Sequence, residues 1–167
     1  MNVEPDSKKR KDSSWFGSKR VKDSVSTPPE LYDALHLQYN FDFDPCPLNE
    51  EWVIDGLKVD WGKRNYVNPP YSRGNIQNWI QKAIAEAEKG NLSVMLIPGR
   101  TCSNYWQELI FPNLTNITFL NYVKFPGYKN HIPLAMVILE FDPEKKKIFE
   151  LTELSTLNHG WKIRSHV

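Results

Sequence analysis

The chain of 167 residues contains only two cysteines, Cys46 and Cys102, and neither belongs to a CxxC or Cys/His group. The sequence therefore indicates neither a zinc site nor a disulfide framework, and both residues are expected to be reduced thiols. No apolar run approaches the length of a transmembrane helix, and the N-terminal residues are charged rather than signal-like. We expect a protein of the cytoplasm or nucleus that is not secreted and needs neither a membrane nor a metal ion.

Neither sign of charge dominates, because the net charge is only +1. The distribution is uneven: residues 1–24 hold seven Lys and Arg against four acids, and residues 25–167 hold fourteen against sixteen. The basic run Lys8, Lys9, Arg10 and Lys11 has polar neighbours and no apolar periodicity, which predicts a flexible tail over residues 1–25. Such a tail is solvated, contacts nucleic-acid phosphates, or acts as a nuclear targeting patch. The sequence leaves these three interpretations open.

The remaining chain has the length and composition of a single domain, with 40% hydrophobic and 25% charged residues. We expect this domain to span residues 26–157 and the end, residues 158–167, to be loosely ordered. Thr27-Pro28-Pro29-Glu30 has the pattern of a capping box and predicts a helix to about Gln38. The alternation of apolar and polar residues predicts a strand over 41–44. A second strand is predicted over 64–67 and leads directly into Asn68.

Further along, apolar residues recur at helical spacing between 76 and 87, and Gly90 supplies the stop. A continuous apolar run over 92–97 predicts a central strand. We also expect a helical turn around Trp52, a helix carrying Tyr105, Trp106, Leu109 and Ile110, strands over 117–123 and 134–141, and an edge strand over 148–154. The alternation predicts an α/β fold with a mainly parallel sheet, an antiparallel C-terminal strand and helices on both faces.

In sheets of this kind, ligands bind beyond the carboxyl ends of the parallel strands. Asp44, Asn68 and the loop after Pro98 all follow predicted strands and should lie at that edge. The tetrapeptide Asn68-Pro69-Pro70-Tyr71 is suited to hold a planar amine there, because the Asn oxygen and a proline-flanked backbone carbonyl are both acceptors. The following Tyr ring can stack on the group that carries the amine. This favours methyl transfer to nitrogen, although Asn before Pro also begins ordinary turns.

Several blocks in order resemble the phage-type DNA N6-adenine methyltransferases, the Dam-like family. They are Thr27-Pro28-Pro29-Glu30-Leu31-Tyr32, Phe41-Asp42-Phe43-Asp44-Pro45-Cys46, Asp60-Trp61, Asn68-Pro69-Pro70-Tyr71 and Pro98-Gly99-Arg100-Thr101. The resemblance implies an abbreviated, Rossmann-like class I methyltransferase sheet that binds S-adenosyl-L-methionine. It implies transfer of the methyl group to adenine in DNA, expected to be double-stranded, after the base is flipped out. If the protein is viral, it acts in the host cell.

The resemblance also assigns roles to residues. Asn68 and the carbonyl of Pro69 would accept the amine hydrogens, Pro70 completes the motif, and Tyr71 would stack on the flipped base. The expected cofactor-binding residues are Asp44, Pro45, Cys46, Thr27, Pro28 and Asp60. Thr27 has a sufficient alternative explanation as a helix cap, and Trp61 is expected in the core rather than on the cofactor. The expected DNA-binding residues are Arg73, Arg100, Thr101 and the basic run of the tail, with a salt bridge to the acidic body as the alternative for Arg100.

Two features depart from larger methyltransferases. The turn Pro45-Cys46-Pro47 has no glycine, and only 23 residues separate Asp44 from Asn68, too few for two strand–helix units. We therefore expect a sheet shortened on that side, with the cofactor's nucleoside held by residues 49–61 or by a partner chain. Asp55 and Asp60 are candidates for the ribose.

Two other functions remain open. One is methylation of another planar nitrogen, such as a protein glutamine or an RNA guanine, and the other is a non-catalytic DNA-binding module. No separate target-recognition domain is evident, so base recognition is expected from the loops 72–74, 101–105 and 124–131. The sequence indicates neither the recognition site nor the oligomeric state.

Overall fold

The structure is a computed structural model that describes residues 25–48, 54–72, 74–129, 135–153 and 162–166. The predicted basic tail, the helical turn around Trp52 and the predicted DNA contact Arg73 lie outside the described residues. The fold is mixed α/β, with one four-stranded sheet and a separate two-stranded sheet.

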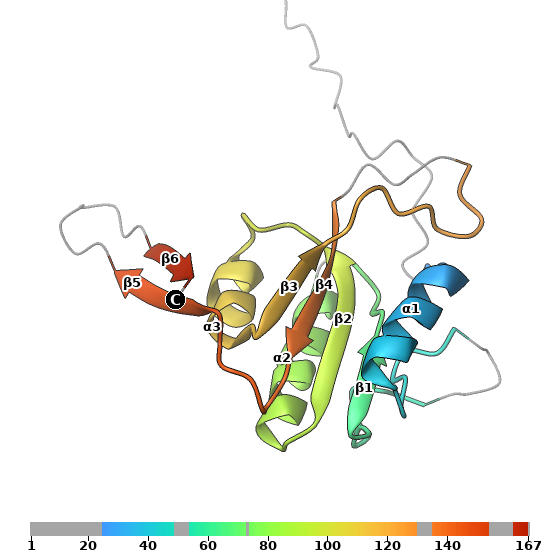
Figure 1. The fold of residues 1–167 in the computed structure, drawn as a ribbon, viewed down its shortest axis with the longest axis horizontal. Coiled ribbons are helices and arrows are strands. Elements are labelled where there is room, and N and C mark those ends of the chain that lie inside the picture. The colour runs from blue at the N-terminus through green and yellow to red at the C-terminus, as the bar shows by residue number, and fades with distance from the viewer. Residues whose placement is uncertain (1–24, 49–53, 73, 130–134, 154–161, 167) are drawn as a thin grey trace, which may run out of the picture.

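The four-stranded sheet has the order β1-β2-β4-β3 (Figure 1). Its strands are β1 (Arg64–Val67), β2 (Leu92–Pro98), β3 (Asn116–Phe119) and β4 (Met136–Phe141). β1 and β2 are parallel, and β4 is antiparallel to both of its neighbours, β2 and β3. Three strands thus run in one direction, as a mainly parallel sheet requires. Because the reversed β4 lies between β2 and β3 rather than at an edge, only one of the three pairings is parallel.

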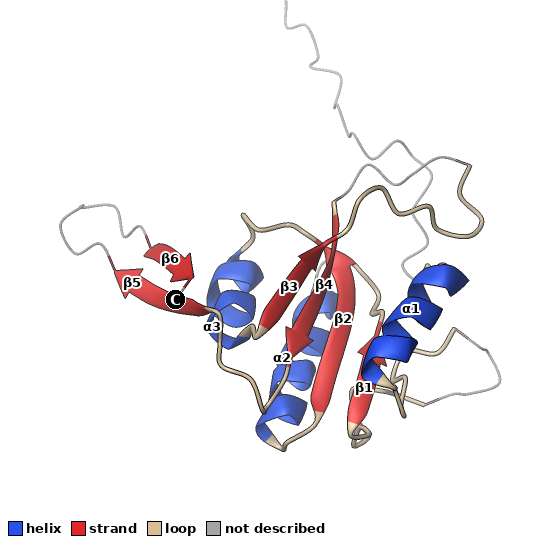
Figure 2. Ribbon diagram, viewed as in Figure 1, coloured by secondary structure: helices blue, strands red, loops and turns tan. Residues whose placement is uncertain are grey.

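Helices cover both faces of this sheet, as predicted (Figure 2). α1 (Pro29–Tyr39) contributes Leu35 to a cluster with Tyr66, Val94 and Ile138. α2 (Asn75–Glu88) packs on the other face, where it meets the neighbouring side chains of the same strands, such as Met95. Side chains on a strand alternate between the two faces, so β2 supplies both clusters.

The predicted helix around Tyr105 forms, but mostly as a π-helix, η1 (Trp106–Ile110), followed by the short α3 (Phe111–Asn113). Trp106 and Ile110 are fully buried against α2 and the sheet. α2 itself agrees closely with the helical spacing of the sequence, and Gly90 after it has a φ of 87°. That left-handed conformation suits glycine and explains why the helix stops there.

The prediction of an edge strand near the C-terminus is wrong. β5 (Phe149–Glu153) does not join the edge of the main sheet but pairs with β6 (Lys162–His166), away from the sheet and beside α3 (Figure 1). The ring of Phe149 packs edge-on against Phe111, with centroids 5.1 Å apart. This apolar contact holds β5 against the helical layer. β6 lies within residues 158–167, for which the sequence predicts loose order.

The start of α1 also differs from the capping-box prediction. Pro28 is the residue before the helix, and its carbonyl accepts the N–H groups of Leu31 and Tyr32, both at 3.0 Å. Thr27 makes no capping hydrogen bond. Its hydroxyl is therefore available for contacts elsewhere.

The predicted strand over 41–44 is reduced to one parallel bridge, between Phe43 and Asn65. Around it, the Tyr66 N–H donates to the Phe43 carbonyl at 3.0 Å and the Asp42 N–H to the Arg64 carbonyl at 2.9 Å. Since Phe43, β1 and β2 all point the same way, the residues that follow them lie at one edge of the sheet. Asp44, Asn68 and the loop after Pro98 share this edge, as predicted, and we call it the carboxyl edge.

Candidate functional site

A cavity of about 320 Å³ opens at the carboxyl edge, between the segment before α1, the start of α1 and the loop after Phe43. Its lining includes Thr27, Asp44, Cys46 and Asn68, together with Tyr66. The volume is at the lower end of the range for small-molecule sites. The structure thus brings together three predicted cofactor residues and the Asn of the tetrapeptide, although these residues are up to 41 positions apart along the chain.

The side-chain amide of Asn68 is held by three hydrogen bonds. Its Nδ2 donates to the Val25 carbonyl at 2.7 Å and to the Thr27 hydroxyl at 3.0 Å, and its Oδ1 accepts from the Tyr71 hydroxyl at 2.6 Å. The Val25 carbonyl can only accept, so the Asn68 atom facing it must be the NH₂ group. This determines which end of the amide is oxygen. The oxygen has a second lone pair with which it can accept from another N–H.

Thr27 is itself held by Tyr66 of β1. The Thr27 Oγ1 and the Tyr66 hydroxyl are 2.5 Å apart, and Tyr66 is only 2% exposed. Burial raises the pKa of Tyr66 strongly, so that the phenol stays protonated at neutral pH. A continuous chain of hydrogen bonds therefore runs from Tyr66 through Thr27 to Asn68.

Tyr71 lies differently from the base-stacking position implied by the resemblance. Its ring packs against both hydrophobic clusters, and its hydroxyl lies 2.6 Å from Asn68 Oδ1 and 3.4 Å from the Leu96 carbonyl. Burial raises the pKa of Tyr71 well above that of a free tyrosine, so the hydroxyl is a donor throughout the neutral range. In this conformation Tyr71 holds the Asn68 oxygen. Of the two prolines before it, Pro69 is buried and Pro70 is half-buried.

The loop from Asp44 to Cys46 is held by a hydrogen bond within the loop and by the close packing of Gly56. Asp44 Oδ1 accepts the Cys46 N–H at 2.8 Å, yet burial outweighs this bond and raises the pKa of Asp44. Gly56 packs on the loop so closely that a Cβ there would lie 2.1 Å from the Pro45 carbonyl oxygen. Trp61, buried as predicted, donates its indole N–H to the Gly56 carbonyl at 2.7 Å. Gly56 therefore allows a later turn to pack closely on the Pro45 backbone.

The other predicted site residues have different positions. The structure does not bring Asp60 to the cavity: its carboxylate is 92% exposed and pairs with Lys89 at 3.0 Å, at the end of α2 and the opposite edge of the sheet. The predicted cofactor contact of Asp60 stays a prediction, and the structure places the residue away from the cavity. Pro28 precedes α1, as described above. Arg100 and Thr101 are exposed in the loop at the carboxyl edge.

Sequence reasoning missed three residues that organise this site: Val25, Tyr66 and Gly56. The Asp55-Gly56 pair was a recognisable turn signal. For Tyr66 the sequence indicated only a strand, and nothing local marked its hydroxyl as a partner of Thr27. Val25 acts through its backbone carbonyl, which no residue pattern reveals.

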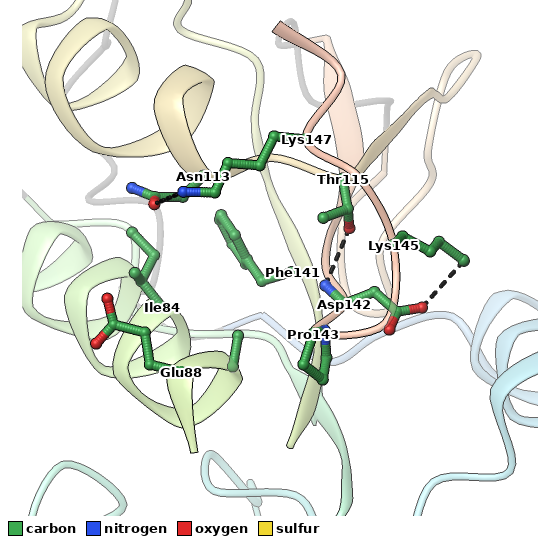
Figure 3. A pocket seen from close by; sticks show the side chains of 10 residues that line it. Ile84, Glu88, Asn113, Thr115, Phe141, Asp142, Pro143, Lys145 and Lys147 are labelled. Carbon is green, nitrogen blue, oxygen red and sulfur yellow. Dashed lines mark hydrogen bonds and ion pairs between the residues drawn. The ribbon is translucent and has the colours of Figure 1, made fainter. Parts of the chain in front are cut away.

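A second, smaller cavity of about 150 Å³ lies at the opposite edge, lined by Phe141 and the polar residues around it (Figure 3). Its polar groups bind one another: the Asp142 N–H donates to Thr115 Oγ1 at 2.9 Å, Lys145 pairs with Asp142 at 3.2 Å, and Lys147 donates to Asn113 at 2.9 Å. These contacts stabilise the end of β4. The cavity is remote from the carboxyl edge and does not belong to the candidate site.

Within the described ranges, no helix has both the length and the apolar character needed to cross a membrane. The same part of the chain contains no group of three or more His, Cys, Asp or Glu side chains placed to hold a metal ion. Both cysteines are free thiols.

Three comparisons show which known proteins the chain is similar to. The family model described as DNA N-6-adenine-methyltransferase (Dam) matches residues 17–137. A DNA N-6-adenine-methyltransferase of Escherichia phage T1 is 34% identical over 99 residues, which cover 53% of this chain and 41% of the phage protein. The chain therefore spans less than half the length of that relative. Among solved structures, the type IIL restriction-modification enzyme MmeI in complex with DNA matches with a TM-score of 0.43 and 12% identity, over 79% of this chain and 24% of that enzyme.

Proposed function

Because the chain belongs to the DNA N-6-adenine-methyltransferase (Dam) family, we propose that it transfers a methyl group from S-adenosyl-L-methionine to the N6 amine of adenine in double-stranded DNA. The observation that carries this proposal is the Asn68 amide, whose oxygen is oriented by three hydrogen bonds beside a cavity that contains the half-buried carboxylate of Asp44. An oriented acceptor next to a ligand cavity is what methyl transfer to an amine requires.

The lining of this cavity fits the proposed cofactor. S-adenosyl-L-methionine, when bound, supplies a methyl group already activated by its sulfonium. Asp44 would hold the cofactor's ammonium group, since the two charges are complementary, and the backbone from Pro45 to Cys46 would lie along its methionine part. Thr27 and Tyr66 offer hydroxyl groups on the other side of the cavity. The nucleoside end would extend past Phe43, where the described residues contain no further strand.

We also infer the class of the fold. Three strands in one direction, a reversed β4 between β2 and β3, and site residues at the carboxyl edge are consistent with a Rossmann-like class I methyltransferase sheet shortened beyond Phe43. On this proposal the missing strands explain why few residues separate Asp44 from Asn68.

The chemical work of the protein is mainly positioning. The Asn68 oxygen and the Pro69 carbonyl would each accept one hydrogen of the adenine amine, which makes the nitrogen a better nucleophile and directs its lone pair at the methyl group. Flipping the base out of the duplex costs a few kcal/mol. Arg100 and Thr101 lie where a DNA backbone crossing the carboxyl edge would pass. Stacking of Tyr71 on the base requires its ring to leave the place between the two clusters.

The test is transfer of labelled methyl from S-adenosyl-L-methionine to mixed-sequence double-stranded DNA, followed by digestion to nucleosides. We expect the label on N6-methyladenine, and we expect Asn68→Ala to reduce the rate by about 100-fold or more, the usual cost of losing one oriented electrostatic partner. Asn113→Ala, at the opposite edge, is the matched control and should retain the rate. Label on cytosine, RNA or protein, or binding of DNA without any binding of the cofactor by calorimetry, would overturn the proposal.

A further inference from the structure

Thr27 has no structural task at the start of α1, yet its hydroxyl is fully engaged. It accepts from Asn68 Nδ2 at 3.0 Å and lies 2.5 Å from the hydroxyl of the buried Tyr66. The three residues come from the segment before α1, from β1 and from the turn after it. Such an arrangement orders Thr27 and Asn68 relative to each other, although 41 positions separate them in the chain.

We propose that Thr27, supported by Tyr66, is a positioning residue that sets the plane of the Asn68 amide and so directs its oxygen at the substrate amine. This proposal rests on the proposed function, because that function supplies the substrate amine toward which the oxygen is directed. The position of the oxygen, however, is a property of the substrate-free protein and can be measured without any reaction.

The last torsion of the Asn68 side chain sets the plane of its amide. This torsion joins a tetrahedral to a planar carbon, and its energy wells are broad, so one hydrogen bond leaves the amide plane free to rotate. The bond to the Val25 carbonyl, at 2.7 Å, determines which end of the amide is nitrogen. The bond to Thr27 occupies the second N–H, and the Tyr71 hydroxyl holds the oxygen at 2.6 Å, so that Thr27 completes the set of three bonds that defines the plane.

Tyr66 makes this arrangement firm. Thr27 lies in a segment without regular structure, so its own side chain would rotate if its hydroxyl had only Asn68 as a partner. Tyr66 is buried in the cluster beneath α1, and its hydroxyl therefore offers Thr27 a fixed partner. The position of the Asn68 oxygen is thus coupled to the core of the sheet. A misplacement of about 1 Å at a reacting group can cost about 100-fold in rate.

The direct test is nuclear magnetic resonance of the ¹⁵N-labelled, substrate-free protein. In the native protein both side-chain amide protons of Asn68 should exchange slowly with water, because both are hydrogen-bonded. Thr27→Val preserves the shape but removes the hydroxyl, and one of the two protons should then exchange about fivefold faster, as expected for loss of one hydrogen bond worth about 1 kcal/mol. Thr27→Ser retains the hydroxyl and should keep the native rates. Unchanged exchange in Thr27→Val would overturn the proposal.

Methyl-transfer kinetics then separate positioning from cofactor contact. For Thr27→Val we expect kcat to fall by about 10- to 100-fold, with the KM for S-adenosyl-L-methionine within about twofold of native and with rescue by Thr27→Ser. A raised KM with unchanged kcat would overturn the proposal, since Thr27 would then only bind the cofactor. If Thr27→Val does not fold, Tyr66→Phe allows the same two measurements, of Asn68 amide exchange and of methyl-transfer kinetics. We expect smaller effects of the same sign. Unchanged exchange and kinetics in Tyr66→Phe would overturn the proposal. Faster amide exchange in an inactive protein would support the positioning role and refute the proposed reaction.

Discussion

Glu86 provides a sharp test of what holds α2 to the sheet. This carboxylate is fully buried at the end of α2. Its Oε1 accepts from Lys82 at 2.7 Å and from Lys89 at 3.0 Å, and its Oε2 accepts from the Asn91 amide at 2.9 Å. Asn91 stands immediately before β2, and its other end accepts from Lys63 at 3.1 Å. The network thus links the helix, the following strand and the segment before β1.

The perturbation is Glu86→Gln, which preserves the shape but replaces one acceptor oxygen by an NH₂ group. If the Gln oxygen faces the two lysines, its NH₂ faces the Asn91 NH₂, and Asn91 cannot flip without losing Lys63. If the Gln side chain turns round, its NH₂ faces two ammonium groups. At least one buried bond to a charged group is therefore lost in either case, at a cost of about 2 kcal/mol. For a chain of this size that lowers Tm by about 4–8 °C.

The assay is thermal or urea unfolding at neutral pH, with Glu88→Gln as the matched control. Glu88 lies two residues further along the same helix and is exposed. Its substitution should therefore change the free energy of unfolding by less than about 0.5 kcal/mol. Equal effects of the two substitutions, or no effect of Glu86→Gln, would refute the reasoning.

The pH dependence has a definite sign. Burial alone would raise the pKa of Glu86, but the hydrogen bonds from Lys82, Asn91 and Lys89 outweigh it and lower the pKa to about 2. In the unfolded chain the value is about 4.3. A depressed pKa stabilises the fold above the unfolded value, and this contribution is lost as the pH falls from about 5 towards 2. The stability difference between native protein and Glu86→Gln should therefore shrink across that window, and a difference that stays constant down to pH 2.5 would contradict this account.

Two further predictions concern the end of α1 and the proposed contact with DNA. Asn40 ends α1 with a φ of 50°, a left-handed conformation that alanine adopts less readily than glycine. Asn40→Ala should therefore destabilise the fold by about 1 kcal/mol, as judged by Tm, whereas Asn40→Gly should not. Equal losses of stability in the two variants would argue against backbone strain. Arg100→Ala should weaken DNA binding and reduce the slope of log affinity against log salt by about 1, whereas Lys146→Ala, exposed at the opposite edge, should leave the slope unchanged. An unaltered slope for Arg100→Ala would remove that residue from the DNA contact.

Much of the fold was predictable because it depends on local patterns. β1 occupies Arg64–Val67, the range expected from the alternation before Asn68. The buried residues of α2 have the helical spacing seen in the sequence, and its end coincides with a glycine that adopts positive φ. The meeting of Asp44 and Asn68 was also predictable, since consecutive parallel strands present their carboxyl ends at the same edge.

The errors occur where a local pattern competes with a distant partner. Thr27 had every local mark of a helix cap, but its hydroxyl binds Tyr66, 39 positions away. Residues 148–154 had strand character, but Phe149 packs on Phe111 and so β5 forms a separate sheet with β6.

The sequence by itself determined most of the elements of the main sheet and its helices, the tetrapeptide and its family, because propensity, spacing and motif are properties of neighbouring residues. Only the tertiary structure decided how the tetrapeptide is held: the Val25 carbonyl and the Thr27 hydroxyl orient the Asn68 amide, and Tyr71 faces inward onto its oxygen. A hydrogen bond has a direction and a length that depend on where two distant backbones pass each other. No spacing along the chain encodes that geometry.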